Sequence, residues 1–235
     1  MRLDKYLSES GVATRRETAR ACRAGQVTVN GIPAIRSDLP VNEFTDQIIY
    51  CGQPVRYRKY VYLLLNKPDG YISATEDGND PVVTELVPDE FRRMGIFPCG
   101  RLDKHTLGLM LLTNDGALSH RLLAPKSHVA KTYRFALREE LPQEKIGLLE
   151  QGVDIGGYRT KPCRIRMDSA STGEITIVEG KYHQIKRMME AVGNKITALE
   201  RISFGTLVLD PEFPRGAWRE LTQQEIDALS RDLQA

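Results

Sequence analysis

The fold and the chemistry of this chain are organised around one stretch, Gly100-Arg101-Leu102-Asp103-Lys104-His105-Thr106-Leu107-Gly108-Leu109-Met110-Leu111-Leu112-Thr113-Asn114-Asp115-Gly116. Its apolar second half predicts a buried strand, and the closing Thr-Asn-Asp-Gly predicts a turn. Asp103 precedes the strand and is flanked by Arg101 and Lys104. Because nearby positive charge favours an ionised carboxylate, Asp103 suits a partly dry site in which an acid must stay charged. The alternative is a turn or cap residue, the commonest role of Asp beside Gly and Thr.

The same stretch resembles the signature of RNA pseudouridine synthases of the RsuA type, which runs Gly-Arg-Leu-Asp, Thr-x-Gly-Leu and Thr-Asn-Asp-Gly. Every position of that pattern is filled here. The resemblance implies that Asp103 is the catalytic aspartate and that Arg101 takes the place of the target base when the base leaves its stack. The sequence Asn-Lys-Pro-Asp-Gly at 66–70 is also typical of these enzymes and has a structural role in them.

Two further motifs of the family follow the aspartate. Residues 131–137 alternate as in a strand, with Tyr133 among the residues that face one way. Taken alone, Tyr133 is most simply a core aromatic, but the resemblance implies that it is the active-site tyrosine. Residues 179–189 open a predicted helix in which Lys186 lies off the apolar stripe. The resemblance implies that Lys186 pairs with the catalytic aspartate, and the Tyr-His-Gln of this motif favours a small-subunit RNA enzyme over a large-subunit one.

The N-terminal part of the chain is basic. Residues 1–60 hold ten Lys and Arg against six Asp and Glu, whereas the remaining residues hold 23 against 25. Thr14 and Glu17 form a predicted capping box, and the helix that follows carries three arginines, Arg16, Arg20 and Arg23, on one face. Most charged stripes are only solvated helix faces, but this one has little acid beside it and suits phosphate binding.

Asn30-Gly31 predicts a tight hairpin after these helices. Two helices followed by a hairpin resemble the RNA-binding module of the small-subunit ribosomal protein S-four, which implies binding to structured RNA. Residues 51–60 are polar and basic and predict the linker. We therefore expect an α+β protein: an S-four-like RNA-binding domain with its linker over 1–59, and a catalytic domain with a mixed, largely antiparallel sheet over 60–235.

Composition excludes several other classes of protein. Of the 235 residues 41% are hydrophobic and 27% are charged, which is ordinary for a soluble globular protein. The four cysteines form no Cys-x-x-Cys, and the chain contains neither G-x-G-x-x-G nor a Walker loop. We expect no metal, no cofactor and no membrane segment, and a monomer in a reducing cytoplasm.

These observations converge on the isomerisation of uridine to pseudouridine in small-subunit (16S) ribosomal RNA. The expected partner is ribosomal RNA or an assembling ribosomal subunit. Asp103, Tyr133 and Lys186 are the expected catalytic residues. The expected RNA-binding residues are Arg101, Arg16, Arg20 and Arg23. A carboxylate beside C1′ of the ribose can attack that carbon, stabilise its charge or remove a ribose proton, and the sequence leaves these three roles open. Two other functions also remain open: a synthase for large-subunit (23S) RNA, and a non-catalytic RNA-binding assembly factor.

Overall fold

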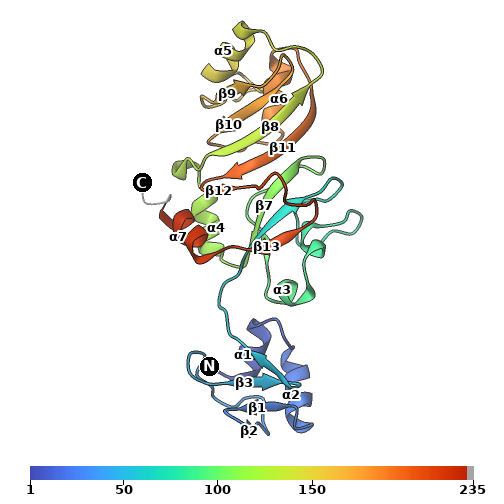
Figure 1. The fold of residues 1–235 in the computed structure, drawn as a ribbon, viewed down its shortest axis with the longest axis vertical. Helices are drawn as coiled ribbons and strands as arrows, with labels where there is room; N and C mark the ends of the chain where they lie inside the picture. The colour runs from blue at the N-terminus through green and yellow to red at the C-terminus, as the bar shows by residue number, and fades with distance from the viewer. Residues whose placement is uncertain (232–235) are drawn as a thin grey trace.

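The computed structural model describes residues 1–231 and contains two separate sheets, each with its own hydrophobic core (Figure 1). The smaller sheet belongs to the N-terminal part and has the strand order β2-β1-β3-β4. Helices α1 and α2 pack on it and close a core around Leu3, Tyr6 and Leu7. The elements of this part are α1 (Leu3–Glu9), α2 (Arg15–Arg23), β1 (Val27–Val29), β2 (Ile32–Pro33), β3 (Ile48–Tyr50) and β4 (Gln53–Val55).

Local sequence signals fix the N-terminal part as expected. The Thr14 hydroxyl accepts the Glu17 amide at 3.2 Å, and the Glu17 carboxylate accepts the Thr14 amide at 2.7 Å, so the capping box is confirmed. Asn30 and Gly31 both have positive φ, 52° and 78°, as a two-residue hairpin between β1 and β2 requires. The predicted hairpin is therefore confirmed as well.

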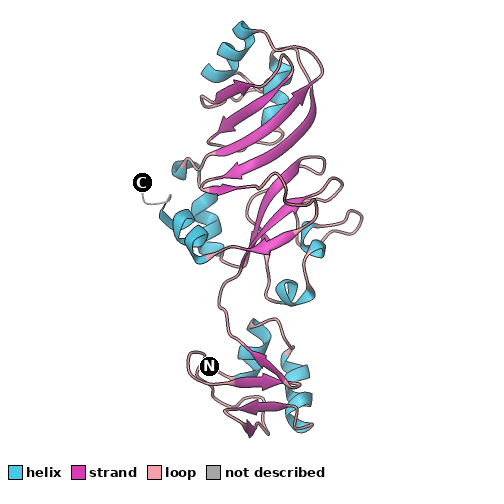
Figure 2. Cartoon of the chain, viewed as in Figure 1, coloured by secondary structure: helices cyan, strands magenta, loops and turns pink. Residues whose placement is uncertain are grey.

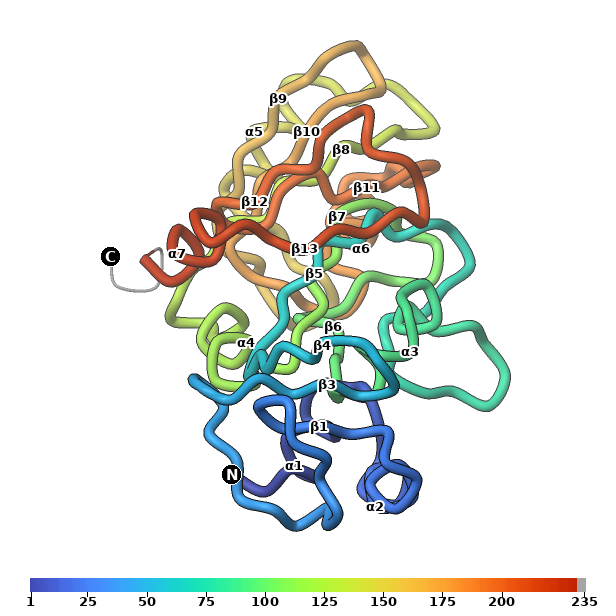
Figure 3. Tube along the Cα trace, turned by 60° about the horizontal axis from the view of Figure 1, so that its bottom comes forward, coloured from blue at the N-terminus to red at the C-terminus, as the bar shows by residue number. Residues whose placement is uncertain are grey.

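The connection between the two sheets is shorter than the predicted linker of residues 51–60. Residues 53–55 form β4, which pairs with β3, so only residues 56–60 connect the two parts. Figure 1 shows this connection as one extended segment, and Figure 3 shows the same chain turned by 60°. The turn after α1 lies against α3 (Asp89–Arg93), where a Cβ on Gly11 would collide with the carbonyl of Glu90. Arg58 of the connection pairs with Glu220.

The larger sheet has nine strands and is mixed but largely antiparallel, as expected. Its main strand order is β13-β5-β7-β11-β8-β10-β9. In addition, β6 pairs with β7 and β12 pairs with β11. Only β7 and β11 run parallel. The strands are β5 (Tyr62–Lys67), β6 (Phe97–Pro98), β7 (Leu107–Thr113), β8 (Lys131–Leu137), β9 (Arg164–Met167), β10 (Thr172–Ile177), β11 (Ile196–Phe204), β12 (Leu207–Val208) and β13 (Trp218–Glu220).

Helices cover both faces of the larger sheet, which explains why its central strands are apolar throughout (Figure 2). Along β7, Met110 and Leu112 enter one core and Leu109 and Leu111 enter the other. Helices α3, α5 and α6 contribute to the first core, and α4 and α7 to the second. The remaining helical segments are η1 (Val83–Leu86), α4 (Gly116–Leu123), η2 (Pro125–Ser127), α5 (Gln143–Gln151), α6 (Gln184–Ala191) and α7 (Gln223–Arg231).

Helix caps agree with the sequence in most places. Asp115 caps α4 by accepting the Leu118 amide at 2.9 Å, and Thr222 exchanges hydrogen bonds with Glu225 at the start of α7. The residue pattern predicts a helix that begins with Pro142, but Pro142 lies just before α5. At the end of the chain the apolar spacing predicts that Leu229 and Leu233 face inward. Leu229 is fully buried, and Leu233 lies outside the described residues. None of the helices within 1–231 has the length and apolarity needed to cross a bilayer.

Candidate active site

A cavity of about 720 Å³ opens where β7 meets β11, between the two halves of the larger sheet. The segments that line it include the loop 100–106 before β7, the first residues of β8, part of β11, and the segment 177–186 that leads into α6. Asp103, Tyr133, Lys186 and Arg101 all line this cavity. The structure therefore gathers in one place the four residues that the sequence motifs singled out in this part of the chain.

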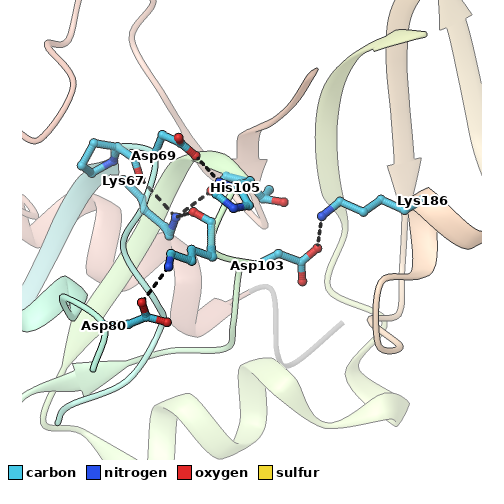
Figure 4. A network of polar contacts seen from close by, with 9 residues as sticks. Lys67, Asp69, Asp80, Asp103, His105 and Lys186 are labelled. Atoms are coloured by element: carbon cyan, nitrogen blue, oxygen red, sulfur yellow. Dashed lines mark hydrogen bonds and ion pairs between the residues drawn. The ribbon is translucent and has the colours of Figure 1, made fainter. Parts of the chain in front are cut away.

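Asp103 and Lys186 face each other across the cavity (Figure 4). The Lys186 Nζ donates to Asp103 Oδ2 at 2.7 Å, although the two residues are 83 positions apart. His183 Nε2 lies 3.5 Å from the other carboxylate oxygen, Oδ1. Both side chains of the pair keep contact with solvent, with exposed fractions of 30% for Asp103 and 28% for Lys186. A substrate that enters the cavity can therefore reach the carboxylate.

The sequence neighbours of Asp103 do not supply its counter-charge. Lys104 pairs with Asp80 at 2.6 Å, and the His105 ring lies 2.9 Å from Asp69 (Figure 4). Arg101 lines the cavity and is exposed. The expectation that flanking cations surround the acid is thus wrong for Lys104, because the charge next to Asp103 comes from α6.

Lys67 holds the loop that carries Asp103. Its side chain is fully buried, and its Nζ donates to the carbonyls of Pro68, Lys104 and Thr106 at 2.9 to 3.1 Å (Figure 4). Burial lowers the pKa of Lys67 to about 8. These three bonds join the turn after β5 to the loop before β7, which matches the structural role that the resemblance gives the Asn-Lys-Pro-Asp-Gly motif.

A second polar network fixes the segment that carries Lys186. Gln184, at the start of α6, donates to the Glu179 carboxylate at 2.8 Å and accepts the Lys181 amide at 2.8 Å. Glu179 also accepts the Tyr158 hydroxyl at 2.6 Å. Glu179 and Gln184 are buried, and the apolar stripe of α6 enters the core. The position of Lys186 is therefore determined by packing and by satisfied hydrogen bonds on both sides.

Tyr182 and His183 lie between these two networks and were not singled out as site residues. His183 has a positive φ of 50°, which is uncommon for a residue other than glycine. Its ring stacks on Tyr182 with the ring centroids 3.9 Å apart. Tyr182 is 69% exposed. An exposed ring beside the acid, already stacked on a second ring, offers a flat surface for a nucleobase.

Tyr133 is a core residue that also borders the cavity. Its side chain is only 8% exposed and packs in the first core, yet it also lines the cavity. The remaining candidate residues, Arg16, Arg20 and Arg23, are exposed on α2 in the N-terminal part and do not line the cavity. None of the three forms an ion pair with the acids of residues 1–231.

Comparison with known proteins gives the class of the chain. Residues 61–191 match the family model for RNA pseudouridylate synthase, and residues 1–47 match the S4 domain. A catalytic sheet joined to an S4 domain defines a modular enzyme that acts on RNA. The chain belongs to the RNA pseudouridine synthase family, so it is an isomerase that converts uridine to pseudouridine.

Three relatives show how far the likeness extends. An uncharacterized RNA pseudouridine synthase of Bacillus subtilis is 46% identical over 235 residues, 98% of each chain. The ribosomal small subunit pseudouridine synthase A of Vibrio parahaemolyticus is 36% identical and covers 97% of this chain and 99% of its own. A crystal structure of a pseudouridylate synthase superimposes with a TM-score of 0.68 at 33% identity, over 97% of this chain and 99% of that one. The resemblance on which the sequence analysis relied is confirmed.

Proposed function

We propose that this enzyme isomerises a uridine of small-subunit (16S) ribosomal RNA and that Asp103 is its catalytic carboxylate. The observation that carries the proposal is the 2.7 Å contact between Asp103 and Lys186 inside an open cavity. The relatives named as ribosomal small subunit pseudouridine synthase A, and the Tyr-His-Gln sequence at 182–184, support the small-subunit target. We expect the enzyme to work as a monomer in the cytoplasm, without metal or cofactor.

The reaction breaks the bond between ribose C1′ and uracil N1, turns the uracil over and rejoins it through C5. The Asp103 carboxylate acts at C1′ or at the neighbouring ribose proton, as nucleophile, electrostatic stabiliser or base. Each of these roles needs the ionised form. The Lys186 ammonium, 2.7 Å away, is the counter-charge of that carboxylate.

The remaining site residues hold the RNA. Tyr133 presents its ring to the cavity, where the target base can stack on it. Extruding a base from its stack costs a few kcal/mol. The exposed Arg101 at the cavity wall fills the space that the extruded uridine leaves. Arg16, Arg20 and Arg23 on α2 contact phosphates of the same RNA and position it.

The Asp103→Asn variant tests the catalytic role. We expect it to bind ribosomal RNA with wild-type affinity and to release no tritium above background from RNA labelled at C5 of uracil. Asp69→Asn is the matched control, because Asp69 is an exposed acid next to the same loop and pairs with His105 instead of Lys186. Turnover by Asp103→Asn comparable to that of Asp69→Asn would remove Asp103 from the mechanism.

A second measurement identifies the RNA. Pseudouridine sites are mapped in both subunit RNAs from a strain that lacks the gene, before and after incubation with the purified enzyme. We expect one small-subunit site to be lost with the gene and restored by the enzyme. A missing site in the large-subunit RNA would replace the proposed target. If no site in either subunit RNA were lost or restored, the proposed ribosomal target would be wrong.

A further inference from the structure

Two cations at the inner end of the cavity have no part in the mechanism described so far. Lys131, at the start of β8, and Arg201, in β11, both line the cavity. Arg201 is only 2% exposed and is one of the largest fully buried side chains of the molecule. We call Lys131 and Arg201 together the cationic floor.

The protein gives Arg201 little to neutralise its charge. Its Nε donates to the carbonyl of Leu109 at 2.8 Å, and its Nη2 lies 3.9 Å from the sulfur of Met110. The guanidinium carbon lies 5.2 Å from the centre of the Phe204 ring. The neighbouring acid, Glu200, pairs with Arg134 and Arg215, and Arg201 makes no ion pair with any acid in the described part of the chain.

Lys131 also makes no ion pair within residues 1–231. Its Nζ donates to the carbonyl of Val129 at 2.9 Å and lies 5.5 Å from the centre of the Phe204 ring. Burial and the charge of Arg201 lower the pKa of Lys131 to about 8. Burial also raises the pKa of the nearby Cys99 thiol, which is therefore uncharged at neutral pH. A buried guanidinium and a half-buried ammonium without a counter-ion are unfavourable unless a ligand brings negative charge.

The strand register places this charge next to the active-site tyrosine. Arg201 is the direct cross-strand partner of Tyr133, and such partners project from the same face of a sheet. Lys131 precedes Tyr133 by two residues and lies on that face as well. A base stacked on Tyr133 therefore has the cationic floor beside its edge.

The reaction itself creates a buried anion at this place. When the C1′–N1 bond breaks, its electron pair stays on the uracil and is shared between N1 and the oxygens O2 and O4. Phosphates remain on the RNA backbone outside, whereas the extruded base reaches furthest into the cavity. We infer that the cationic floor stabilises the uracil anion between cleavage and rejoining, given the proposed position of the uridine beside Asp103.

This assignment also fits the turning of the base. Rotation by half a turn about the axis through N3 and C6 exchanges N1 with C5 and O2 with O4. A cation that contacts one carbonyl oxygen before the turn therefore contacts the other oxygen after it. The electron pair of the anion then forms the C5–C1′ bond, the C5 proton leaves to water, and N1 takes up a proton from water. The charge at the floor favours the free anion in both orientations.

The test compares leaving groups of different acidity. Arg201→Met and Lys131→Met are assayed in single turnover on transcripts of both subunit RNAs that contain either uridine or 5-fluorouridine. Because 5-fluorouridine has no C5 proton to lose, consumption of the starting nucleoside is measured, by nucleoside mass spectrometry. We expect each variant to slow the uridine transcript about 10²-fold. The loss with 5-fluorouridine should be about tenfold smaller, because the more acidic fluorouracil needs less help to leave. Arg134→Met, an exposed position of β8, is the control and should leave both rates unchanged.

The outcomes separate this role from the others. Equal loss with both transcripts would overturn the inference and give the cationic floor a structural role. A raised KM with unchanged kcat would overturn it in favour of phosphate binding. If Arg201→Met does not fold, the inference is tested by Lys131→Met alone, from the ratio of its rate loss with uridine to its rate loss with 5-fluorouridine. Because transcripts of both subunits are used and Asp103 is intact, the ratio of the two rates does not depend on which RNA is the target.

Discussion

At the scale of single residues, the site works because its acid and its amine come from segments that the fold brings together. Lys186 reaches Asp103 from α6, while the adjacent Lys104 turns away to Asp80. A pair with both side chains about 30% exposed adds little to stability. We therefore expect this pair to contribute to the proposed catalysis, in a cavity where a bound nucleotide displaces much of the water.

Replacement of Lys67 should lower the stability of the protein. We expect Lys67→Met to lower the free energy of unfolding by about 2 kcal/mol at pH 7, because three buried carbonyls lose their donor. The measurement is urea unfolding. Lys104→Met, which removes a largely exposed ion pair, is the control and should change stability by less than about 0.5 kcal/mol. Equal effects of the two changes would contradict this role of Lys67.

The same lysine predicts how stability depends on pH. Burial lowers the pKa of Lys67 to about 8, below the value of about 10.4 for an exposed lysine. Between these values the unfolded chain binds more protons than the folded one, so stability rises with pH from about 8 to about 10. Lys131 adds to this rise in the same direction. Lys67→Met should remove the contribution of Lys67 and make the rise shallower.

Sequence reasoning found the residues that belong to contiguous motifs and missed those defined by contacts between segments. Asp103 and Lys186 stand in recognisable patterns, and their contact was expected from the resemblance. Arg201 could have been noticed as a charge in the apolar strand of residues 196–204, and Lys131 as a charge on the same face as Tyr133. Their function depends on which strands pair, and the residue pattern of one strand does not contain that information.

At the scale of elements, the cavity depends on the parallel contact between β7 and β11. The register pairs Leu107 with Glu200 and Gly108 with Arg201. We call this parallel contact the seam. It joins β5 and β7 on one side to β11, β8 and β10 on the other. The loop with Asp103 leads into β7 beside the seam. Periodicity predicted most of these strands, but the order in which they pair had to come from the structure.

Gly108 is the position at which this seam can be broken. Its φ of +97° and the nearby carbonyl of Arg201 leave no room for a Cβ. We expect Gly108→Ala to cost about 3 kcal/mol or more in urea unfolding, because both the backbone conformation and the strand contact must change. Gly116→Ala is the control, since a Cβ there meets nothing and the helical position suits alanine. Near wild-type stability in Gly108→Ala would show that the seam tolerates a shift.

At the scale of the whole molecule, the N-terminal part and the larger part are joined by a short connection and touch over a small contact. Residues 56–60 join the two parts, and the turn at Gly11 and Val12 contacts α3 of the larger part, with Arg93 donating to the Val12 carbonyl at 3.5 Å. The arginine stripe of α2 thus lies in the N-terminal part of the chain, and the cavity lies in the larger part. RNA that contacts both binds through two sites, so that phosphate binding and base chemistry can be altered separately.

The arginine stripe should therefore govern affinity and its salt dependence, and leave the chemical step unchanged. In the triple variant Arg16→Gln, Arg20→Gln and Arg23→Gln, each lost phosphate contact removes roughly 0.7 to 0.9 from the slope of log Kd against log salt concentration. We expect the slope to fall by about 2, measured by filter binding, with an unchanged single-turnover rate at saturating RNA. Arg36→Gln, whose partner is Asp38, is the control. An unchanged slope in the triple variant would mean that the stripe is only a solvated helix face and that another basic surface holds the RNA.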